Sequence, residues 1–348
     1  MSAQPLKPSQ SPAGHRRASG VLRIDRSSAP PVAEDAVARE QTAAAQQPGH
    51  GAAVAVRAHI ELMLTPRTAT ALLSCPNSEQ GATAFMASIG ARGGRVIESE
   101  QHLNVETGYL FQRLHADISQ VAGGAPQVEG LLADVSRRYG MTLTVQRTER
   151  RKRVGIMVSK YDHCLYDLLL RHRAGELDCD IPVIISNHPD ASRVARQFGI
   201  DFEVIGKTAA NKREAEDQEC ALLLDQGVDL VVMARYMQVL SDNFVSRWER
   251  RVINIHHSFL PAFIGAKPYH QAHQRGVKLI GATAHYATAN LDEGPIIEQD
   301  VARCSHKDSA EDLVRKGRDL EKQVLARAVR WHLDNRVIIH GNKTVVFD

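Results

Sequence analysis

The second half of the chain alternates short apolar runs with amphipathic stretches. Near-continuous apolar runs, typical of strands buried on both faces of a parallel sheet, occupy residues 154–159, 181–186, 202–205 and 228–233. Helical stretches separate them at about 162–173, 191–198, 209–226 and 242–250. This alternation predicts a doubly wound, Rossmann-like α/β fold with a mostly parallel sheet, whose ligands bind beyond the carboxyl ends of the strands.

Further strands and one long helix follow this region. Residues 251–256 and 281–286 have strand patterns, and a loop at 291–295 leads into the apolar strand residues Ile296 and Ile297. Asp308 or Ser309 can cap an amphipathic helix that reaches about residue 335. A hairpin turning at 341–342 is expected to close the chain.

The region in front of residue 147 has a different order of elements. Strand patterns at 69–74, 95–103, 109–116 and 142–145 surround helical stretches at 81–91 and 127–139, after a first apolar run at 54–64. Strand, helix, two strands, helix, strand is the order of a ferredoxin-like α+β domain. We therefore predict a disordered tail at 1–51, a regulatory or oligomerising domain at 52–149, and a catalytic domain at 150–348.

The composition and net charge of the chain indicate which classes of partner and which cellular location to expect. The chain has 348 residues, of which 43% are hydrophobic, and its net charge is only +3 without basic stripes, so nucleic acid is not an expected partner. No apolar run is long enough to cross a membrane, and the tail's acidic residues argue against a targeting peptide, so we expect a cytoplasmic protein. The five cysteines are widely spaced and contain no Cys-x-x-Cys pair, which indicates reduced thiols rather than disulfides or a zinc ribbon.

Polar side chains converge at the predicted strand ends. Asn254 and His256 lie two residues apart on one strand, so they share a face near its carboxyl end. Asp292, on a loop before Gly294 and Pro295, can reach back to the imidazole. An Asn-x-His pair by itself is more often ordinary polarity at a strand end than a catalytic pair.

The residues around Asn254 and His256 favour the catalytic interpretation of this pair. Asn254 to Pro261 (NIHHSFLP), 265–270 (GAKPYH), and His285 with Leu291 to Pro295 (LDEGP) closely resemble the folate-dependent formyltransferase superfamily, and within it the branch that hydrolyses 10-formyltetrahydrofolate. The resemblance runs from about residue 153 to 304. It implies that Asn254, His256 and Asp292 are catalytic, and that the reaction needs no bound cofactor or metal.

The chemistry of formyl transfer suits these side chains. The Asn254 amide can donate a hydrogen bond to the oxyanion that forms on the formyl group. His256 can donate a proton when it is cationic, and the Asp292 carboxylate would hold it in that state and accept a proton from water. His285 is expected to orient the water or Asp292, the alternative being an ordinary buried polar residue. His257 and Ser258 are expected to shape the turn.

A folate pocket is predicted after residue 233. The residues that follow this buried strand resemble the pteridine pocket of the superfamily, where backbone amides read the ring and apolar side chains cover it. The alternative, without a role in binding, is a strand followed by a helix cap. The expected substrate-binding residues are Arg235, Tyr236, Met237, Val239, Leu240 and Leu291.

The first strand-to-helix turn favours a hydrolase over a transferase. In the glycinamide-ribotide formyltransferases this turn is glycine-rich and wraps the phosphate of the acceptor. Here Tyr161, Asp162 and His163 would crowd that space, which leaves water as the nucleophile. Cys164 is read as a buried thiol rather than a nucleophile. Glycinamide-ribotide formyltransferase remains the alternative function.

Two other functions are weighed against this hypothesis. A metal hydrolase could use histidines, but none of them shows the helical spacing and general-base Glu of zinc hydrolases. The histidines in question are His256, His257, His270, His273 and His285. The chain could also be an amino-acid sensor that keeps the folate fold without catalysis. Only the first domain supports this alternative, and all three expected catalytic side chains are present.

The first domain resembles the ACT domains that sense amino acids. The resemblance rests on residues 74–77 (SCPN) followed by Gly81 and a helix, and on 96–101 (VIESEQ). The chain departs from the family's Asp-Arg-Pro-Gly at 77–81, which leaves a purely oligomerising role open. Glycine or methionine is the expected effector, and a homo-oligomer is the expected assembly.

Overall fold

The computed structural model describes residues 67–76, 79–147, 150–262 and 267–348. The predicted disordered tail at 1–51 and the apolar run at 54–64 lie outside these ranges. Contacts divide the chain into two units, Met1–Gln41 and Thr42–Asp348, and every described residue belongs to the second.

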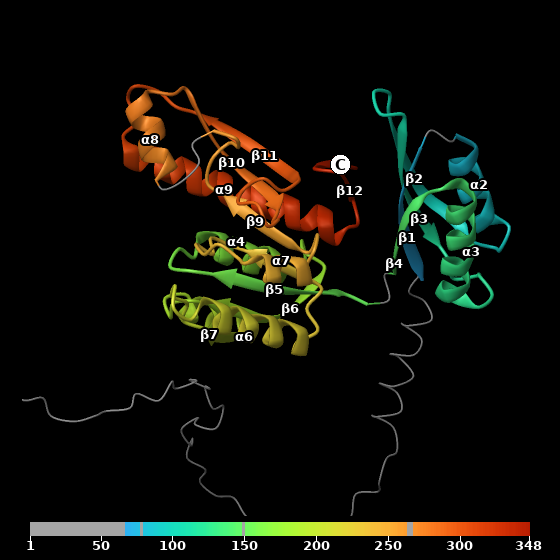
Figure 1. Ribbon diagram of the computed structural model, residues 1–348, viewed down its shortest axis with the longest axis horizontal. Coiled ribbons are helices and arrows are strands. Elements are labelled where there is room, and N and C mark those ends of the chain that lie inside the picture. Colours follow the sequence, from blue (N-terminus) through green and yellow to red (C-terminus); the bar gives the residue numbers. More distant parts are fainter. Residues whose placement is uncertain (1–66, 77–78, 148–149, 263–266) are drawn as a thin grey trace, which may run out of the picture. The chain divides into compact units, whose positions relative to one another are not determined.

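The first described elements form a four-stranded antiparallel sheet with two helices on one face (Figure 1). They are β1 (Thr68–Pro76), α2 (Glu79–Gly90), β2 (Arg95–Asn104), β3 (Tyr109–Asp117), α3 (Gly124–Tyr139) and β4 (Thr142–Arg147). The strand order β2-β3-β1-β4 confirms the predicted ferredoxin-like topology. The core between sheet and helices buries Leu73, Phe85, Leu114 and Leu132 almost completely.

A seven-stranded sheet forms the centre of the second part, in the order β11-β10-β9-β8-β5-β6-β7. Strands β5 to β9 are parallel, whereas β10 runs antiparallel to both of its neighbours, which confirms the mostly parallel α/β fold. The strands are β5 (Lys152–Val158), β6 (Cys179–Ser186), β7 (Asp201–Val204), β8 (Leu230–Met233), β9 (Val252–His256), β10 (Leu279–Tyr286) and β11 (Ile296–Arg303).

Helices cover both faces of this sheet, as expected for a doubly wound fold. The helices are α4 (His163–Arg173), α5 (Ser192–Phe198), α6 (Lys212–Asp225), α7 (Asp242–Arg247), α8 (Pro268–Arg275) and α9 (Ala310–Leu333). One core cluster joins α4, α5, α8 and α9 to the sheet, and another joins α6 and α7. Gly155 lets α6 approach β5, because a Cβ there would lie 2.5 Å from a methyl carbon of Leu223.

Two features near the carboxyl end of the chain confirm predictions from the sequence. Ser309 and Asp312 form the capping box that starts α9. The predicted hairpin is formed by β12 (Val337–His340) and β13 (Lys343–Val346), which turn at 341–342. Helix α8 was not predicted, because it is a short polar segment with a weak apolar pattern.

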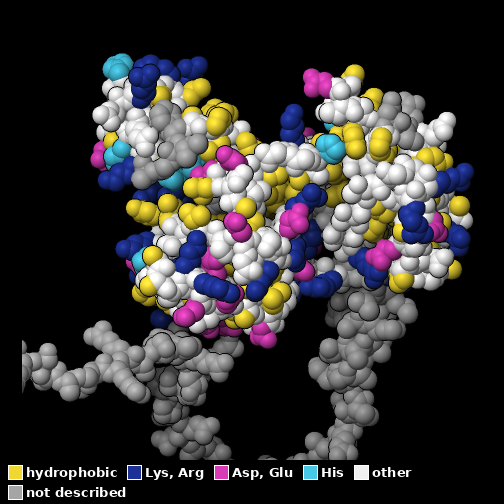
Figure 2. Space-filling view, in the orientation of Figure 1, with side chains coloured by type: hydrophobic (Ala, Val, Ile, Leu, Met, Phe, Trp, Pro, Cys, Tyr) yellow, Lys and Arg dark blue, Asp and Glu magenta, His cyan; other side chains and the backbone are white. Residues whose placement is uncertain are grey.

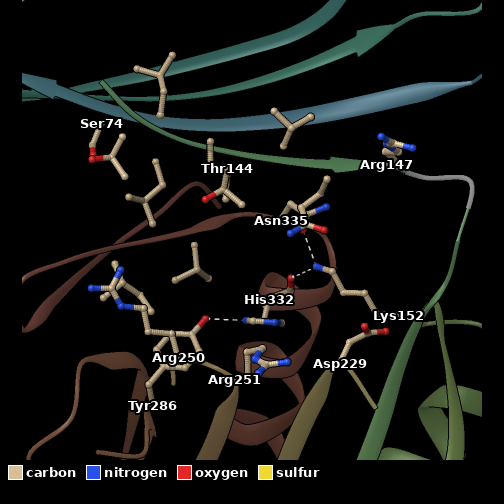
Figure 3. Close-up of a pocket in the computed structure, with 18 of the residues that line it drawn as sticks. Ser74, Thr144, Arg147, Lys152, Asp229, Arg250, Arg251, Tyr286, His332 and Asn335 are labelled. Atoms are coloured by element: carbon tan, nitrogen blue, oxygen red, sulfur yellow. Dashed lines mark hydrogen bonds between the residues drawn. The ribbon is translucent and has the colours of Figure 1, made fainter. Parts of the chain in front are cut away.

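The carboxyl end of α9 is held by Lys152, as the close-up in Figure 3 shows. The Lys152 ammonium donates hydrogen bonds to the backbone carbonyls of His332 (2.8 Å) and Leu333 (3.1 Å), at the end of the helix where carbonyls are not fully paired by the helix itself. The His332 ring is in turn hydrogen-bonded to the Tyr286 hydroxyl at 2.8 Å. Lys152, Tyr286 and His332 line a cavity of about 560 Å³, to which residues of β1 and β4 also contribute.

The surface is mixed in charge. On the face drawn in Figure 2, basic and acidic side chains are interspersed rather than gathered into a stripe of one sign. Among the described residues, no helix combines the length and apolarity needed to span a membrane.

Candidate active site

Two neighbouring strands bring the predicted catalytic residues together. Asn254 and His256 lie at the carboxyl end of β9, and β10 places His285 directly opposite Asn254 in the antiparallel register. All three side chains line one cavity beside the loops 235–240 and 287–292. The spacing of two residues along a strand was therefore a sound guide to a shared face.

Asp292 reaches the imidazole because its loop folds back tightly onto β10. The Tyr286 amide donates a hydrogen bond to the Pro295 carbonyl at 2.9 Å. A Cβ at Gly294 would lie 1.7 Å from the Tyr286 carbonyl oxygen, so only glycine allows this approach. Asp292 itself has a φ of 58°. Its carboxylate lies 3.2 Å from His256 Nδ1, and the other ring nitrogen, Nε2, is buried without a hydrogen-bond partner among the described residues.

The charge state of Asp292 follows from its neighbours. Burial raises the pKa of this carboxyl, but the hydrogen bond from His256 and the nearby rings of His256 and His285 lower it by more, so its pKa lies well below the usual range. Asp292 is therefore a carboxylate at physiological pH. A carboxylate with a lowered pKa is a strong electrostatic partner for a histidine and a weak general base.

His285 contacts Asn254 as well as Asp292. Its Nδ1 donates to the backbone carbonyl of Tyr286 at 3.0 Å, because a carbonyl oxygen can only accept. In the neutral ring, Nε2 then accepts from the Asn254 amide nitrogen at 3.2 Å. The same nitrogen lies 3.6 Å from Asp292. The sequence argument missed the contact with Asn254, which fixes the direction in which the amide points.

His257 and Ser258 have surroundings that differ from those of His256. Burial, together with the positive charges of Arg235 and His256, lowers the pKa of His257 to about 4, so its ring is neutral at physiological pH. The Ser258 hydroxyl donates to the Ala262 carbonyl at 2.7 Å. Neither side chain is therefore available as an acid in the reaction; the sequence argument had assigned both to the shape of the turn.

The loop after β8 forms the apolar wall of the cavity. Met237, Val239 and Leu291 expose 51%, 53% and 59% of their surface there, an unusual exposure for apolar side chains that line one cavity. The backbone amide of Met237 is anchored by the Ser159 hydroxyl at 3.1 Å. Tyr236 and Leu240 are almost fully buried beneath this wall.

One residue near the cavity, Glu321, was not identified from the sequence as functional. Glu321, on α9, is 1% exposed and accepts hydrogen bonds from His163 and from Tyr269. Its oxygen also lies 3.4 Å from Nε of Arg235. The available signal was a charged residue at a core position of an amphipathic helix.

The histidines weighed as metal ligands do not gather into a metal site. In the described part of the chain, the one group of three potential ligand side chains consists of His163, Cys164 and Glu321, whose ligand atoms lie within 4.8 Å of one another. Burial raises the pKa of the Cys164 thiol well above its usual value, and the charge of Glu321 adds to this. A buried, protonated thiol is neither a good ligand nor a good nucleophile.

Comparisons with known proteins agree with this geometry. A family model described as formyl transferase matches residues 152–329. A formyltetrahydrofolate deformylase from Synechocystis is 50% identical over 281 residues, which cover 80% of this chain and 98% of that protein. The chain belongs to the formyltetrahydrofolate deformylase family. The deformylase from Bacillus subtilis is 45% identical over 80% of this chain and 93% of its own length.

Solved structures separate the deformylases from the transformylases. The deformylase from Pseudomonas syringae pv. tomato is 40% identical, covers 85% of this chain and 100% of its own, and superposes with a TM-score of 0.79. A glycinamide ribonucleotide transformylase from Symbiobacterium toebii is 32% identical, covers 58% of this chain and 97% of its own, and has a TM-score of 0.55. The likeness to the deformylase thus extends over more of the chain.

Proposed function

We propose that this protein hydrolyses 10-formyltetrahydrofolate to formate and tetrahydrofolate. The observation that carries the proposal is the state of His256, whose Nδ1 is held by Asp292 while its buried Nε2 has no partner among the described residues. An unpaired, buried nitrogen is costly unless a ligand pairs with it. In this cavity, the ligand that suits it is the departing nitrogen or the oxyanion of a formamide.

The reaction needs three contributions from the protein. Water attacks the formyl carbon, and the oxyanion that forms accepts a hydrogen bond from Asn254, an interaction worth about 3 kcal/mol in such sites. His256 donates a proton to N10 as the bond from carbon to N10 breaks. Of the two protons that the attacking water brought, one returns to His256 and the other passes to solvent as formate leaves. Asp292 remains ionised, holds the imidazole in orientation and balances its charge.

His285 is proposed as a positioning residue. Its contacts with the Tyr286 carbonyl and with Asn254 leave the second amide proton of Asn254 free to face the formyl oxygen. A positioned donor is worth more than a mobile one, because it requires no reorganisation during the reaction.

The proposed folate site combines this cavity with the loop after β8. The cavity holds about 210 Å³, below the roughly 300–1,000 Å³ of pockets that enclose a whole drug-sized ligand, so one end of the substrate fits inside. We assign that end to the pteridine ring, covered by the apolar side chains of the loop. The binding residues are Arg235, Tyr236, Met237, Val239, Leu240 and Leu291.

One assay separates hydrolysis from transfer. Purified protein with 10-formyltetrahydrofolate and no acceptor should release formate, and added glycinamide ribotide should be formylated slowly or not at all. Tyr161, half exposed in the turn between β5 and α4, supports this outcome because a bulky side chain stands in the turn that the sequence argument assigned to the acceptor phosphate. Formate release that depends on the acceptor would overturn the proposal in favour of the transferase.

No cofactor is proposed for the reaction, since Asn254, His256 and Asp292 supply the donor, the acid and the charge. Activity should therefore persist after dialysis against excess chelator. A loss of activity that zinc restores would support the metal hydrolase instead.

We propose that the ferredoxin-like part regulates or assembles the enzyme, with the domain boundaries at 51 and 149. The edge strand β2 exposes Val96, Ile97 and Leu103, and such an edge favours pairing with a second copy of the chain. Sedimentation should reveal a homo-oligomer, and calorimetry should detect glycine or methionine as an effector. A monomer that binds neither amino acid would refute this role.

The proposed location is the cytoplasm. All five cysteines are free, four of them buried, which suits a reducing compartment. Fractionation of cells that make the full chain tests this assignment.

A further inference from the structure

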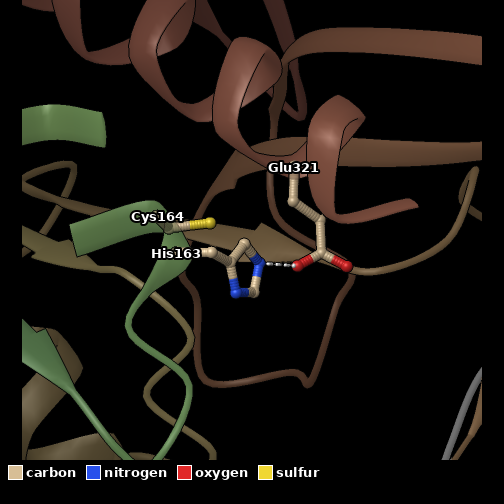
Figure 4. Close-up of side chains that lie close together, drawn as sticks. All are labelled: His163, Cys164 and Glu321. Atoms are coloured by element: carbon tan, nitrogen blue, oxygen red, sulfur yellow. Dashed lines mark hydrogen bonds and ion pairs between the residues drawn. The ribbon is translucent and has the colours of Figure 1, made fainter. Parts of the chain in front are cut away.

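Three donors surround one buried carboxylate next to the catalytic cavity. Glu321 accepts from His163 Nε2 at 2.7 Å and from the Tyr269 hydroxyl at 2.8 Å, and Figure 4 shows the histidine contact. The guanidinium of Arg235 lies 3.4 Å from the oxygen that His163 contacts. This arrangement has the composition of a binding site for a carboxylate, and the carboxylate that fills it comes from the chain itself.

Arg235 connects this cluster to the site of reaction. It lines the cavity that contains Asn254, His256 and Asp292, and its side chain is only 10% exposed. Its Nε and Nη1 atoms are buried without hydrogen-bond partners among the described residues. Its backbone has a φ of 64°, a left-handed conformation that costs a residue with a Cβ roughly 1–2 kcal/mol. A buried, incompletely bonded guanidinium at this place is suited to bind an anion.

Helix α9 is adapted to hold the Glu321 carboxylate in place. Gly317 lies one turn before Glu321, and a Cβ at this position would be 2.0 Å from Cζ of Tyr269. The missing side chain allows the Tyr269 ring to lie against the helix and its hydroxyl to reach Glu321. A glycine in a helix interior is unfavourable by about 1 kcal/mol relative to alanine. The contact between Tyr269 and Glu321 offsets this loss of helix stability.

We propose that Glu321 is a specificity-determining residue, the internal counter-ion of Arg235 that keeps foreign anions from binding beside His256. Two classes of anion are excluded: a phosphorylated acceptor amine and the product formate. This inference rests on the proposed hydrolysis, because formate is generated in the same cavity. With Glu321 in place, the carboxylate of formate meets a guanidinium that is already neutralised, and it leaves.

The charge of Glu321 is the feature on which the inference depends. Burial raises the pKa of this carboxyl, but the hydrogen bond from His163 and the charge of Arg235 lower it by more, so the pKa is below its usual value. Substitution of Glu321 by glutamine keeps the shape and removes the charge. The positive charge of Arg235 is then unbalanced in a region of low dielectric constant, where charges interact strongly.

The test measures anion binding directly, without turnover. We would titrate the full-length protein with ¹³C-labelled formate, followed by NMR, and with inorganic phosphate, followed by calorimetry at constant ionic strength. Glu321→Gln should bind at least one of the two anions at least ~10-fold more tightly than the unmodified protein. The double variant Glu321→Gln/Arg235→Gln should lose this gain, because the guanidinium is the group that binds.

A matched control is available on the other face of the sheet. Glu219 is also fully buried and accepts hydrogen bonds from a tyrosine and a cation, Tyr236 at 2.6 Å and Lys207 at 2.8 Å. Glu219→Gln should bind the two anions as weakly as the unmodified protein. Equal anion affinity in Glu321→Gln and the unmodified protein, with both folded by circular dichroism, would overturn the inference.

Two further outcomes can be told apart from those above: the variant does not fold, or the unmodified protein does not hydrolyse the substrate. If Glu321→Gln does not fold, Glu321→Asp replaces it. Its shorter side chain draws the carboxylate away from Arg235, so tighter anion binding than in the unmodified protein supports the assignment while unchanged binding refutes it. If the unmodified protein releases no formate from 10-formyltetrahydrofolate, the proposed hydrolysis fails, whereas the comparison of anion affinities still stands on its own.

Discussion

His256 presents Nδ1 to the Asp292 carboxylate at 3.2 Å and leaves its other nitrogen unpaired in the cavity. Replacing Asp292 by asparagine keeps the shape of this contact and removes the charge that supports a cationic imidazole. We expect Asp292→Asn to fold normally and to lower kcat by at least ~100-fold, the usual scale for loss of acid-base function. Steady-state formate release measures the effect.

A suitable control for this variant is Asp319→Asn, on the exposed side of α9, where the carboxylate only pairs with Lys322. Its turnover should equal that of the unmodified protein, since exposed ion pairs of this kind contribute little. Near-normal turnover in Asp292→Asn would remove the role assigned to the carboxylate.

Asn254 and His285 are in contact, so we expect the effects of substituting them on kcat to be coupled. Asn254→Ala removes the donor to the oxyanion and should lower kcat by 10²–10³-fold, as roughly expected for loss of one such donor. His285→Phe should lower kcat by about 10-fold, because the amide remains but is no longer held. If His285 acts only through Asn254, the double variant should be no slower than Asn254→Ala. Multiplication of the two effects would show an independent role for His285.

The strand-end chemistry could be predicted from the sequence because it follows local rules. The period of two along β9 placed Asn254 and His256 on one face, and the capping residues placed the start of α9 at Asp308 or Ser309, of which Ser309 is the cap. The loop with Gly294 and Pro295 indicated where Asp292 would lie. Each of these inferences depends on residues that are close together in the chain.

The cluster around Glu321 could not be predicted in this way. His163, Arg235, Tyr269 and Glu321 belong to four separate segments, and nothing in their local patterns says that they meet. The apolar spacing of α9 places Glu321 on the buried face of the helix, but this spacing does not say which groups it meets there. Only the tertiary arrangement shows that His163, Tyr269 and Arg235 surround it.

The neutral state of His257 predicts how stability responds to acid. Its pKa is about 4 in the folded protein and about 6.5 in an unfolded chain, so the unfolded state binds more protons between these values. The contribution of His257 to the free energy of unfolding is therefore complete above pH 6.5. It should fall as the pH drops from 6.5 towards 4, by up to about 1.4 kcal/mol per pH unit.

Denaturant unfolding at several pH values tests this expectation. His257→Asn should show a shallower loss of stability between pH 6.5 and 4 than the unmodified protein. The stabilisation from Asp292 does not obscure the comparison, because its folded pKa is lowered and its contribution is lost only at more acidic pH. Identical slopes in the two proteins would show that His257 is not the group that titrates.

Two glycines in helices make the last prediction, because they differ only in what surrounds them. Gly317 in α9 faces the Tyr269 ring, with 2.0 Å between a built Cβ and Cζ, whereas Gly130 in α3 has no neighbouring atom within 4 Å of such a carbon. Gly130→Ala should stabilise the protein by about 0.5–1 kcal/mol through helix propensity. Gly317→Ala should destabilise it by about 1–3 kcal/mol, since the added methyl group displaces Tyr269 from Glu321. Denaturant unfolding of both variants gives the comparison, and a stabilising Gly317→Ala would mean that the tyrosine moves aside without cost.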